Sequence, residues 1–140
     1  MTDTILRKTI YLKASREEVW AYLTQPEKLA IWFHAPKSPL VEGEELALYG
    51  AESGDKICWG EVRTARAPEY LEYTFTIKPL NGAFTTVRWT LEDVAAGTRM
   101  SLEHEGLPAD LPGFDLTLAL DKGWEGHMGQ MRDHIHNITP

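Results

Sequence analysis

Hydrophobic and polar residues alternate along much of the chain, which is the pattern of strands with one buried face. The first such segment, residues 5–12, places Leu6, Ile10 and Leu12 on one side. Five later segments with the same alternation are also predicted to be strands. They are residues 46–49, 57–67, 70–77, 84–92 and 98–105. Because the connections between the last four are short and turn-like, we predict an antiparallel sheet with one solvent-exposed face.

Two short helices are predicted between the first and second strands. Ser15 and Glu18 have the spacing of a capping box, which predicts a helix over Arg16–Thr24. A second helix is predicted over Pro26–Trp32, because a proline in the first helical turn removes an amide that has no partner there anyway. Residues 34–45 contain two prolines and a glycine and are predicted to form a loop.

The last part of the chain, residues 114–137, predicts one long amphipathic helix. A sheet of six strands can bury one face under such a helix. The predicted fold class is therefore α+β: a curved six-stranded antiparallel sheet around a long C-terminal helix, with two short helices between strands 1 and 2. A length of 140 residues fits a single domain, 1–140. The side chains expected to be well buried are Trp20, Leu23, Val62, Val87, Leu91, Leu102 and Ile135.

Composition and charge exclude several partners. The net charge is −7, and the 14 Lys and Arg residues are scattered among 21 carboxylates. Binding to nucleic acid or to an anionic membrane needs a concentrated basic face, so neither is expected. There is no apolar leader and no membrane-spanning run. With Cys58 as the one cysteine, no disulfide is possible within the chain, and we predict a cytoplasmic protein.

Short motifs along nearly the whole chain resemble a known family. They are ASREEVW at 14–20, LAIWF at 29–33, GEV at 60–62, PEYL at 68–71, YTF at 73–75, VRWTLE at 87–92, GTR at 97–99, EHEG at 103–106 and GW at 123–124. In combination they resemble the START-like (SRPBCC) superfamily, in particular its bacterial branch similar to the C-terminal domain of the activator of heat-shock-protein-90 ATPase. The resemblance implies a helix-grip fold with a cavity between sheet and long helix.

The same resemblance frames the expected function. Members of the superfamily bind lipids, polyketides, flavonoids or other apolar molecules, and a few catalyse cyclisation or hydrolysis. The eukaryotic activator has a separate N-terminal chaperone-binding domain, for which 140 residues leave no room. A chaperone partner is therefore not expected, and a homodimer is left open.

Aromatic residues are the main candidates for lining the cavity, since ligand pockets are mostly apolar and aromatic. Each could equally fill the core. Trp59 is the least certain, because strand alternation places it with Ile57 and Glu61, opposite Cys58 and Val62. The predicted cavity residues are Trp32, Phe33, Trp59, Tyr73, Phe75, Trp89, His104, Leu120, Trp124, His127, Met128 and Met131.

Three glycines, Gly123, Gly126 and Gly129, recur every three residues in the predicted long helix. Each costs about 0.8–1.0 kcal/mol relative to alanine in a helix interior. They could leave a void above the sheet, allow close packing of helix on sheet, or break the helix near Gly123. Gly126 is expected at the edge of the face that meets the sheet.

Polar residues near the predicted cavity give only weak support for metal binding or acid–base catalysis. His104, His127 and Cys58 could form a metal site, but no further ligand has a fixed spacing, so no metal or cofactor is predicted. The acid–base candidates are His104, His127, Glu61 and Tyr73, and no catalytic residue is assigned.

The first functional hypothesis is binding of an apolar, ring-containing or lipid-like molecule, oriented by His104 and His127. The alternatives are a cofactor-free enzyme of the polyketide cyclase or hydrolase kind, which is less expected, and a co-chaperone-like interaction module.

Overall fold

Six strands form one antiparallel sheet in a computed structural model that describes residues 4–108 and 111–137. The strands lie in the order β1-β6-β5-β4-β3-β2. Their bounds are β1 Thr4–Leu12, β2 Glu45–Tyr49, β3 Lys56–Arg66, β4 Tyr70–Phe75, β5 Thr85–Val94 and β6 Gly97–Leu107. Each strand pairs with the next one along the chain, except that β1 joins the sheet beside β6.

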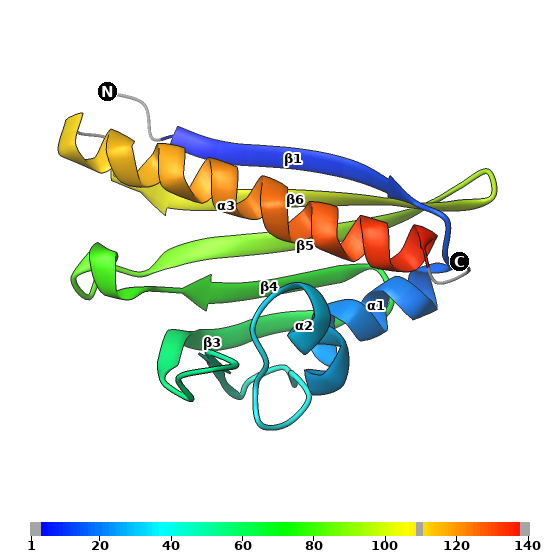
Figure 1. Cartoon of the computed structure of the whole chain (residues 1–140), viewed down its shortest axis with the longest axis horizontal. Helices are drawn as coiled ribbons and strands as arrows, with labels where there is room; N and C mark the ends of the chain where they lie inside the picture. The colour runs from blue at the N-terminus through cyan, green and yellow to red at the C-terminus, as the bar shows by residue number, and fades with distance from the viewer. Residues whose placement is uncertain (1–3, 109–110, 138–140) are drawn as a thin grey trace.

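The helices occupy one face of this sheet. Figure 1 shows α3 (Leu111–His136) lying across the strands, with α1 (Arg16–Thr24) and α2 (Pro26–Trp32) beside its C-terminal half. A short 3-10 turn, η1 (Lys78–Leu80), connects β4 to β5. The predicted α+β helix-grip architecture is confirmed.

Both short helices begin and end where the sequence predicted. The amide of Glu18 donates to the Ser15 hydroxyl at 3.2 Å, and the amide of Ser15 donates to the Glu18 carboxylate at 3.3 Å. This reciprocal pair satisfies two amides that lack partners within the helix. Pro26 lies in the first turn of α2, as expected.

The long helix begins earlier than predicted, at Leu111 rather than residue 114. Pro112 is accommodated because it lies in the first turn, where no amide is needed as a donor. The helix continues through Gly123, so the alternative of a break there is wrong. Within residues 4–108 and 111–137, no helix is both long and apolar enough to cross a membrane.

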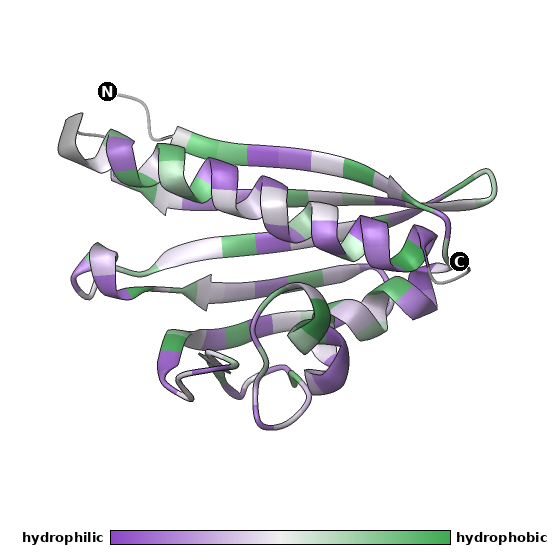
Figure 2. Ribbon diagram, in the orientation of Figure 1, coloured by the Kyte–Doolittle hydropathy of each residue, from purple (hydrophilic) through white to green (hydrophobic). Residues whose placement is uncertain are grey.

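Burial alternates along β4 and β5 as predicted. Figure 2 shows hydrophobic and hydrophilic residues interspersed along the strands. Five of the seven side chains expected in the core are buried: Leu23, Val62, Val87, Leu91 and Leu102. Trp20 and Ile135 are only partly buried, so the prediction was too strong for them. Trp20 lies beside the core-facing side of α1, and Ile135 lies in the last turn of α3.

Polar contacts fix α3 against its neighbours. Lys8 has the inner-face parity of β1, and its ammonium pairs with the Asp121 carboxylate of α3 at 2.9 Å. Near the other end, the Tyr22 hydroxyl of α1 lies 2.8 Å from Nδ1 of His134. The backbone amide of Lys13 donates to Nε2 of His136 at 3.0 Å. The helix is therefore held both to the edge strand and to α1, which sets its height above the sheet.

Candidate functional site

A cavity of about 170 Å³ lies between α3, the inner face of the sheet and the segment that follows α2. It is lined by Phe33, His34, Cys58, Phe75, Ile77, Leu120, Gly123, Trp124 and His127. No Lys, Arg, Asp or Glu of the described residues is among its lining side chains. An apolar cavity of about 150 Å³ in another protein holds benzene, so this one has room for about one ring.

The structure brings five of the predicted cavity residues together: Phe33, Phe75, Leu120, Trp124 and His127. Six others lie behind the lining as fully buried core. They are Trp32, Tyr73, Trp89, His104, Met128 and Met131. Because a side chain in the core and one in a cavity wall obey the same alternation, the sequence could not separate the two groups.

Trp59 does not line the cavity. It lies on the outer face of β3, where it shares a different hollow with Phe84 and Glu61. The Lys56 ammonium lies 5.7 Å from the Trp59 ring centroid. The physical reason is strand alternation, which turns Cys58 inward and Trp59 outward. Glu61, one of the acid–base candidates, is exposed on that outer face for the same reason.

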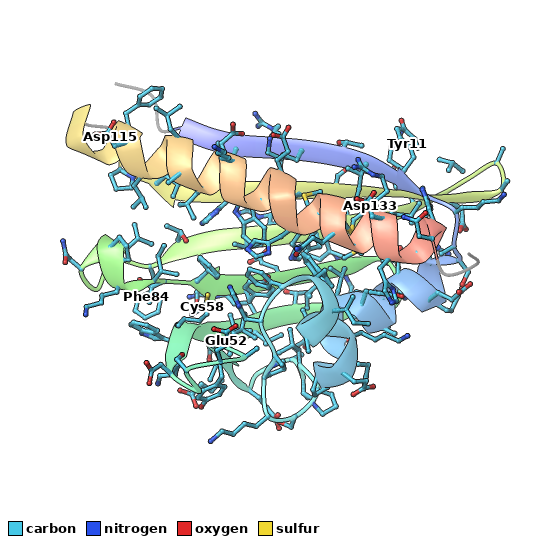
Figure 3. All side chains as sticks on the ribbon, in the orientation of Figure 1. Tyr11, Glu52, Cys58, Phe84, Asp115 and Asp133 are labelled. Carbon is cyan, nitrogen blue, oxygen red and sulfur yellow. The ribbon has the colours of Figure 1, made fainter. Side chains whose placement is uncertain are left out.

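Figure 3 labels Cys58 on β3 and Phe84 just before β5, at the same part of the sheet. Tyr11 and Asp133, also labelled, mark the opposite end of the molecule.

Trp124 is the centre of the aromatic wall. Its ring centroid lies 5.1 Å from that of Phe33, 5.5 Å from Trp89 and 6.0 Å from Phe75. Trp32 stacks on Phe33 at 5.3 Å and supports it from behind. Offset and edge-on aromatic pairs of this kind are favourable beyond the area they bury. The wall is therefore a pre-formed cluster of contacting aromatic rings.

His104 is fully buried in a closed chain of hydrogen bonds. The indole N–H of Trp124 donates to its Nδ1 at 3.0 Å, which fixes the proton of the neutral ring on Nε2. That N–H then donates to the Thr85 hydroxyl at 2.8 Å, and the hydroxyl donates to the Phe75 carbonyl at 2.7 Å. Both ring nitrogens are occupied, so His104 has no free polar atom with which to orient a ligand.

The other acid–base candidate in the core is also occupied. The Tyr73 hydroxyl accepts from the Trp89 indole N–H at 3.0 Å, and burial raises the pKa of this phenol. Burial lowers the pKa of His104 to about 4, so the ring is neutral at pH 7. Neither side chain is available as a proton carrier for a molecule in the cavity.

His127 is different, because it lines the cavity with one nitrogen free. Its Nδ1 lies 2.8 Å from the Trp32 carbonyl oxygen. A carbonyl only accepts, so Nδ1 carries the proton and, in the neutral ring, Nε2 carries a lone pair. Among the described residues, Nε2 has no hydrogen-bond partner.

Four lining residues, His34, Cys58, Ile77 and Gly123, were missing from the predicted set of cavity residues. The ring of His34 lies 5.4 Å from that of His127, and burial together with the charge of His127 lowers the pKa of His34. Burial raises the pKa of the Cys58 thiol to about 12, so it is neutral. The inward parity of Cys58 was a usable signal, whereas His34 lies in a loop and has no periodicity to reveal it.

Metal binding is not supported by this grouping. In residues 4–108 and 111–137, no three His, Cys, Asp or Glu side chains come together to hold an ion. The metal site of His104, His127 and Cys58 considered from the sequence is also not supported, because both ring nitrogens of His104 already make hydrogen bonds.

The glycines of α3 do not pack closely on the sheet. A Cβ atom built at Gly123 or Gly126 would meet no heavy atom within 4 Å, so the close-packing alternative is wrong. Gly123 lines the cavity, so at this one position the missing side chain does leave space, as the void alternative proposed. Gly126 is exposed and does not line it, so its predicted place beside the sheet is also wrong.

Larger hollows on the surface have a different character. One of about 490 Å³ contains Arg16, Arg66 and Glu92, and one of about 480 Å³ contains Arg7, Lys8 and Glu125. Both are lined by charged side chains. Unlike these two hollows, the smaller cavity under α3 has no charged side chain in its described lining, so we take it as the candidate site.

Comparison with known families gives a match over most of the chain. The model of the family described as "Activator of Hsp90 ATPase homolog 1-like protein" matches residues 13–136. Among curated proteins, none matches the sequence.

Solved structures share the fold at low sequence identity. Protein MLL2253 from Mesorhizobium loti is 20% identical, with a TM-score of 0.83. The match covers 98% of this chain and 99% of that one. DynU16, from the dynemicin biosynthetic locus, is 20% identical with a TM-score of 0.81. The match covers 96% of this chain and 48% of DynU16, so this chain spans about half its length.

A third structure, the Aha1 dimer from Colwellia psychrerythraea, is 17% identical with a TM-score of 0.77. It covers 94% of this chain and 96% of that one. At these identities the likenesses establish the fold.

Proposed function

Because the chain belongs to the family of Activator of Hsp90 ATPase homolog 1-like proteins, within the START-like superfamily, we propose that it binds a small neutral apolar molecule of about one aromatic ring. The binding site is the cavity between the sheet and α3. The observation that carries the proposal is a pre-formed apolar cavity of about 170 Å³ whose wall is built around Trp124.

The polar groups around the cavity support a neutral ligand. The three buried indole N–H groups are already bonded: Trp32 to the Tyr22 carbonyl, Trp89 to Tyr73 and Trp124 to His104. Buried polar groups that are satisfied in this way leave the wall apolar. With no charged side chain in the lining, a carboxylate or ammonium ligand would lose its hydration without a partner.

The alternative functions have less support. Of the four acid–base candidates only His127 lines the cavity. The second imidazole in that wall belongs to His34, whose ring centroid lies 5.4 Å from that of His127, and no hydrogen bond joins the two among the described residues. For a co-chaperone role, the exposed apolar side chains Phe84, Phe114 and Leu118 are the available surface.

Self-association also stays a prediction for this chain, and sedimentation analysis of its molecular mass would test it.

The proposal is tested by titrating the protein with toluene and measuring its melting temperature and tryptophan fluorescence. A ligand present at 100 times its dissociation constant should stabilise the protein by about 2.7 kcal/mol. Gly123→Leu should weaken or abolish this response, because Gly123 lines the cavity and an added side chain finds open space there. Gly126→Leu is the matched control: it makes the same change one turn further along, at an exposed position outside the cavity.

Two results would overturn the proposal. The first is no response of the wild-type protein to toluene or to other one-ring hydrocarbons at their solubility limits. The second is a response that persists unchanged in Gly123→Leu, which would place the binding elsewhere.

A further inference from the structure

One polar atom of a lining side chain, Nε2 of His127, can take part in hydrogen bonding in only one direction. Because the Trp32 carbonyl accepts a hydrogen bond from the Nδ1–H of His127, the neutral ring can only accept at Nε2. The carbonyl belongs to the last residue of α2, and the histidine belongs to α3. The tautomer is therefore set by how two helices pack, before any ligand enters.

The remaining polar groups do not impose a direction. His34 makes no hydrogen bond within the described residues, so its imidazole can present either an N–H or a lone pair. The neutral Cys58 thiol is both a weak donor and a weak acceptor. The Trp124 indole N–H, the strongest donor near the wall, is committed to His104. Among the described side chains that line the cavity, His127 is thus the one whose hydrogen-bonding direction is fixed, with an unpaired acceptor at Nε2.

We propose that the cavity selects a hydroxylated ring, a phenol, over a hydrocarbon of the same shape, and that the phenolic O–H donates to Nε2 of His127. This inference rests on the proposed function and names its ligand class. A hydroxyl placed in an apolar cavity without a partner loses its hydration, whereas a hydroxyl that reaches a lone pair recovers the lost hydrogen bond. The pairing needs no charge on either side, which agrees with the uncharged lining.

The test compares p-cresol with p-xylene, which replaces the hydroxyl by a methyl group of similar size. Dissociation constants are measured by calorimetry or NMR titration at pH 7.5 for the wild type, His127→Asn and His34→Asn. An asparagine at 127 can keep an N–H near the position of Nδ1, toward the Trp32 carbonyl, while removing Nε2. His34→Asn is the matched control, because it removes the other imidazole of the same wall.

We expect p-cresol to bind the wild type more tightly than p-xylene. In His127→Asn the ratio of the two dissociation constants should shift against p-cresol by about tenfold, the effect of one hydrogen bond. In His34→Asn both dissociation constants should rise, because His34 also lines the cavity, but their ratio should shift by less than in His127→Asn. A thermal melt of each variant without ligand checks that it is folded.

The outcomes separate this inference from the proposed function. If p-xylene binds and p-cresol binds no more tightly, or if His127→Asn leaves the ratio unchanged, the selection of a hydroxyl is wrong and the apolar site stands. If the ratio of dissociation constants shifts in His34→Asn instead, the acceptor is His34, and the assignment of the acceptor to His127 is wrong. If neither probe binds the wild type, both the inference and the proposed function fail.

Discussion

The indole N–H of Trp124 donates to Nδ1 of His104 at 3.0 Å and joins α3 to the central part of the sheet. Both side chains are buried, and the bond continues through the Thr85 hydroxyl to the backbone of β4. Since Trp124 also forms the cavity wall, the bond that orients its ring fixes the shape of the site. Stability and ligand binding are therefore coupled through this pair.

One consequence is a pH dependence of stability. The pKa of His104 is about 4 in the folded protein and near 6.5 in the unfolded chain, so between these values the unfolded chain binds more protons. The contribution of His104 is therefore fully present above pH 6.5 and is lost as the pH falls toward 4. Over that range it amounts to about 3 kcal/mol.

The measurement is urea unfolding between pH 4 and pH 7. His104→Gln should lower stability at pH 7 and flatten the slope between pH 4 and 6.5. His34→Gln should keep most of the slope. A slope that is undiminished in His104→Gln would mean that other groups cause the acid sensitivity.

Two glycines should respond to alanine with opposite signs. Gly126 is exposed inside α3 with nothing within 4 Å of an added Cβ, so Gly126→Ala should stabilise by about 0.8–1.0 kcal/mol. At Gly60 of β3 an added Cβ would collide with the backbone oxygen of Thr74 on β4. Gly60→Ala should therefore destabilise by about 1–3 kcal/mol, as overpacking does. Chemical unfolding midpoints of the two variants check both signs, and equal signs would contradict the geometry.

The sheet core has its own test at Leu102, which is 1% exposed on β6. Leu102→Ala should cost roughly 2–5 kcal/mol, since it removes buried methyl groups and leaves a cavity. The free energy of unfolding in urea measures the loss. A loss below about half a kilocalorie per mole, within the range of surface substitutions, would mean that Leu102 does not face the core.

Cys58 should be a slow thiol although it lines the cavity. Burial raises its pKa to about 12, and the thiolate is the reactive form. At pH 8 we expect alkylation by iodoacetamide to be roughly a thousandfold slower in the native protein than in the urea-unfolded chain, because about three pKa units separate the two states. Mass spectrometry of the labelled fraction follows the reaction. Comparable rates in both states would show that the thiol is not protected.

Much of the fold could be predicted from local signals. The capping box of Ser15 and Glu18 and the position of Pro26 fixed the bounds of α1 and α2, because these effects act within one helical turn. The start of α3 was predicted three residues late, because the prolines of the preceding segment suggested a break. A proline in a first turn and a proline in a loop look the same from the sequence.

The candidate site was predicted only in part. Strand alternation already placed Trp59 with Glu61 on the outer face, and the structure shows that this local signal outweighs the general expectation that tryptophans surround a cavity. His34 was not predicted, because a loop residue has no periodic neighbours that reveal which way its side chain points.

By itself, the sequence determined which residues face inward, since two-residue and 3.6-residue periodicities are properties of the local backbone. Only the tertiary structure decided which inward residues line a cavity and which fill the core. That depends on how closely α3 approaches the sheet, and contacts such as Lys8 with Asp121 and Trp124 with His104 set this distance. The same packing turned His104 into a structural hydrogen-bonding group and left His127 with a free nitrogen. A hydrogen-bond partner nearly a hundred residues away along the chain has no signature in local sequence.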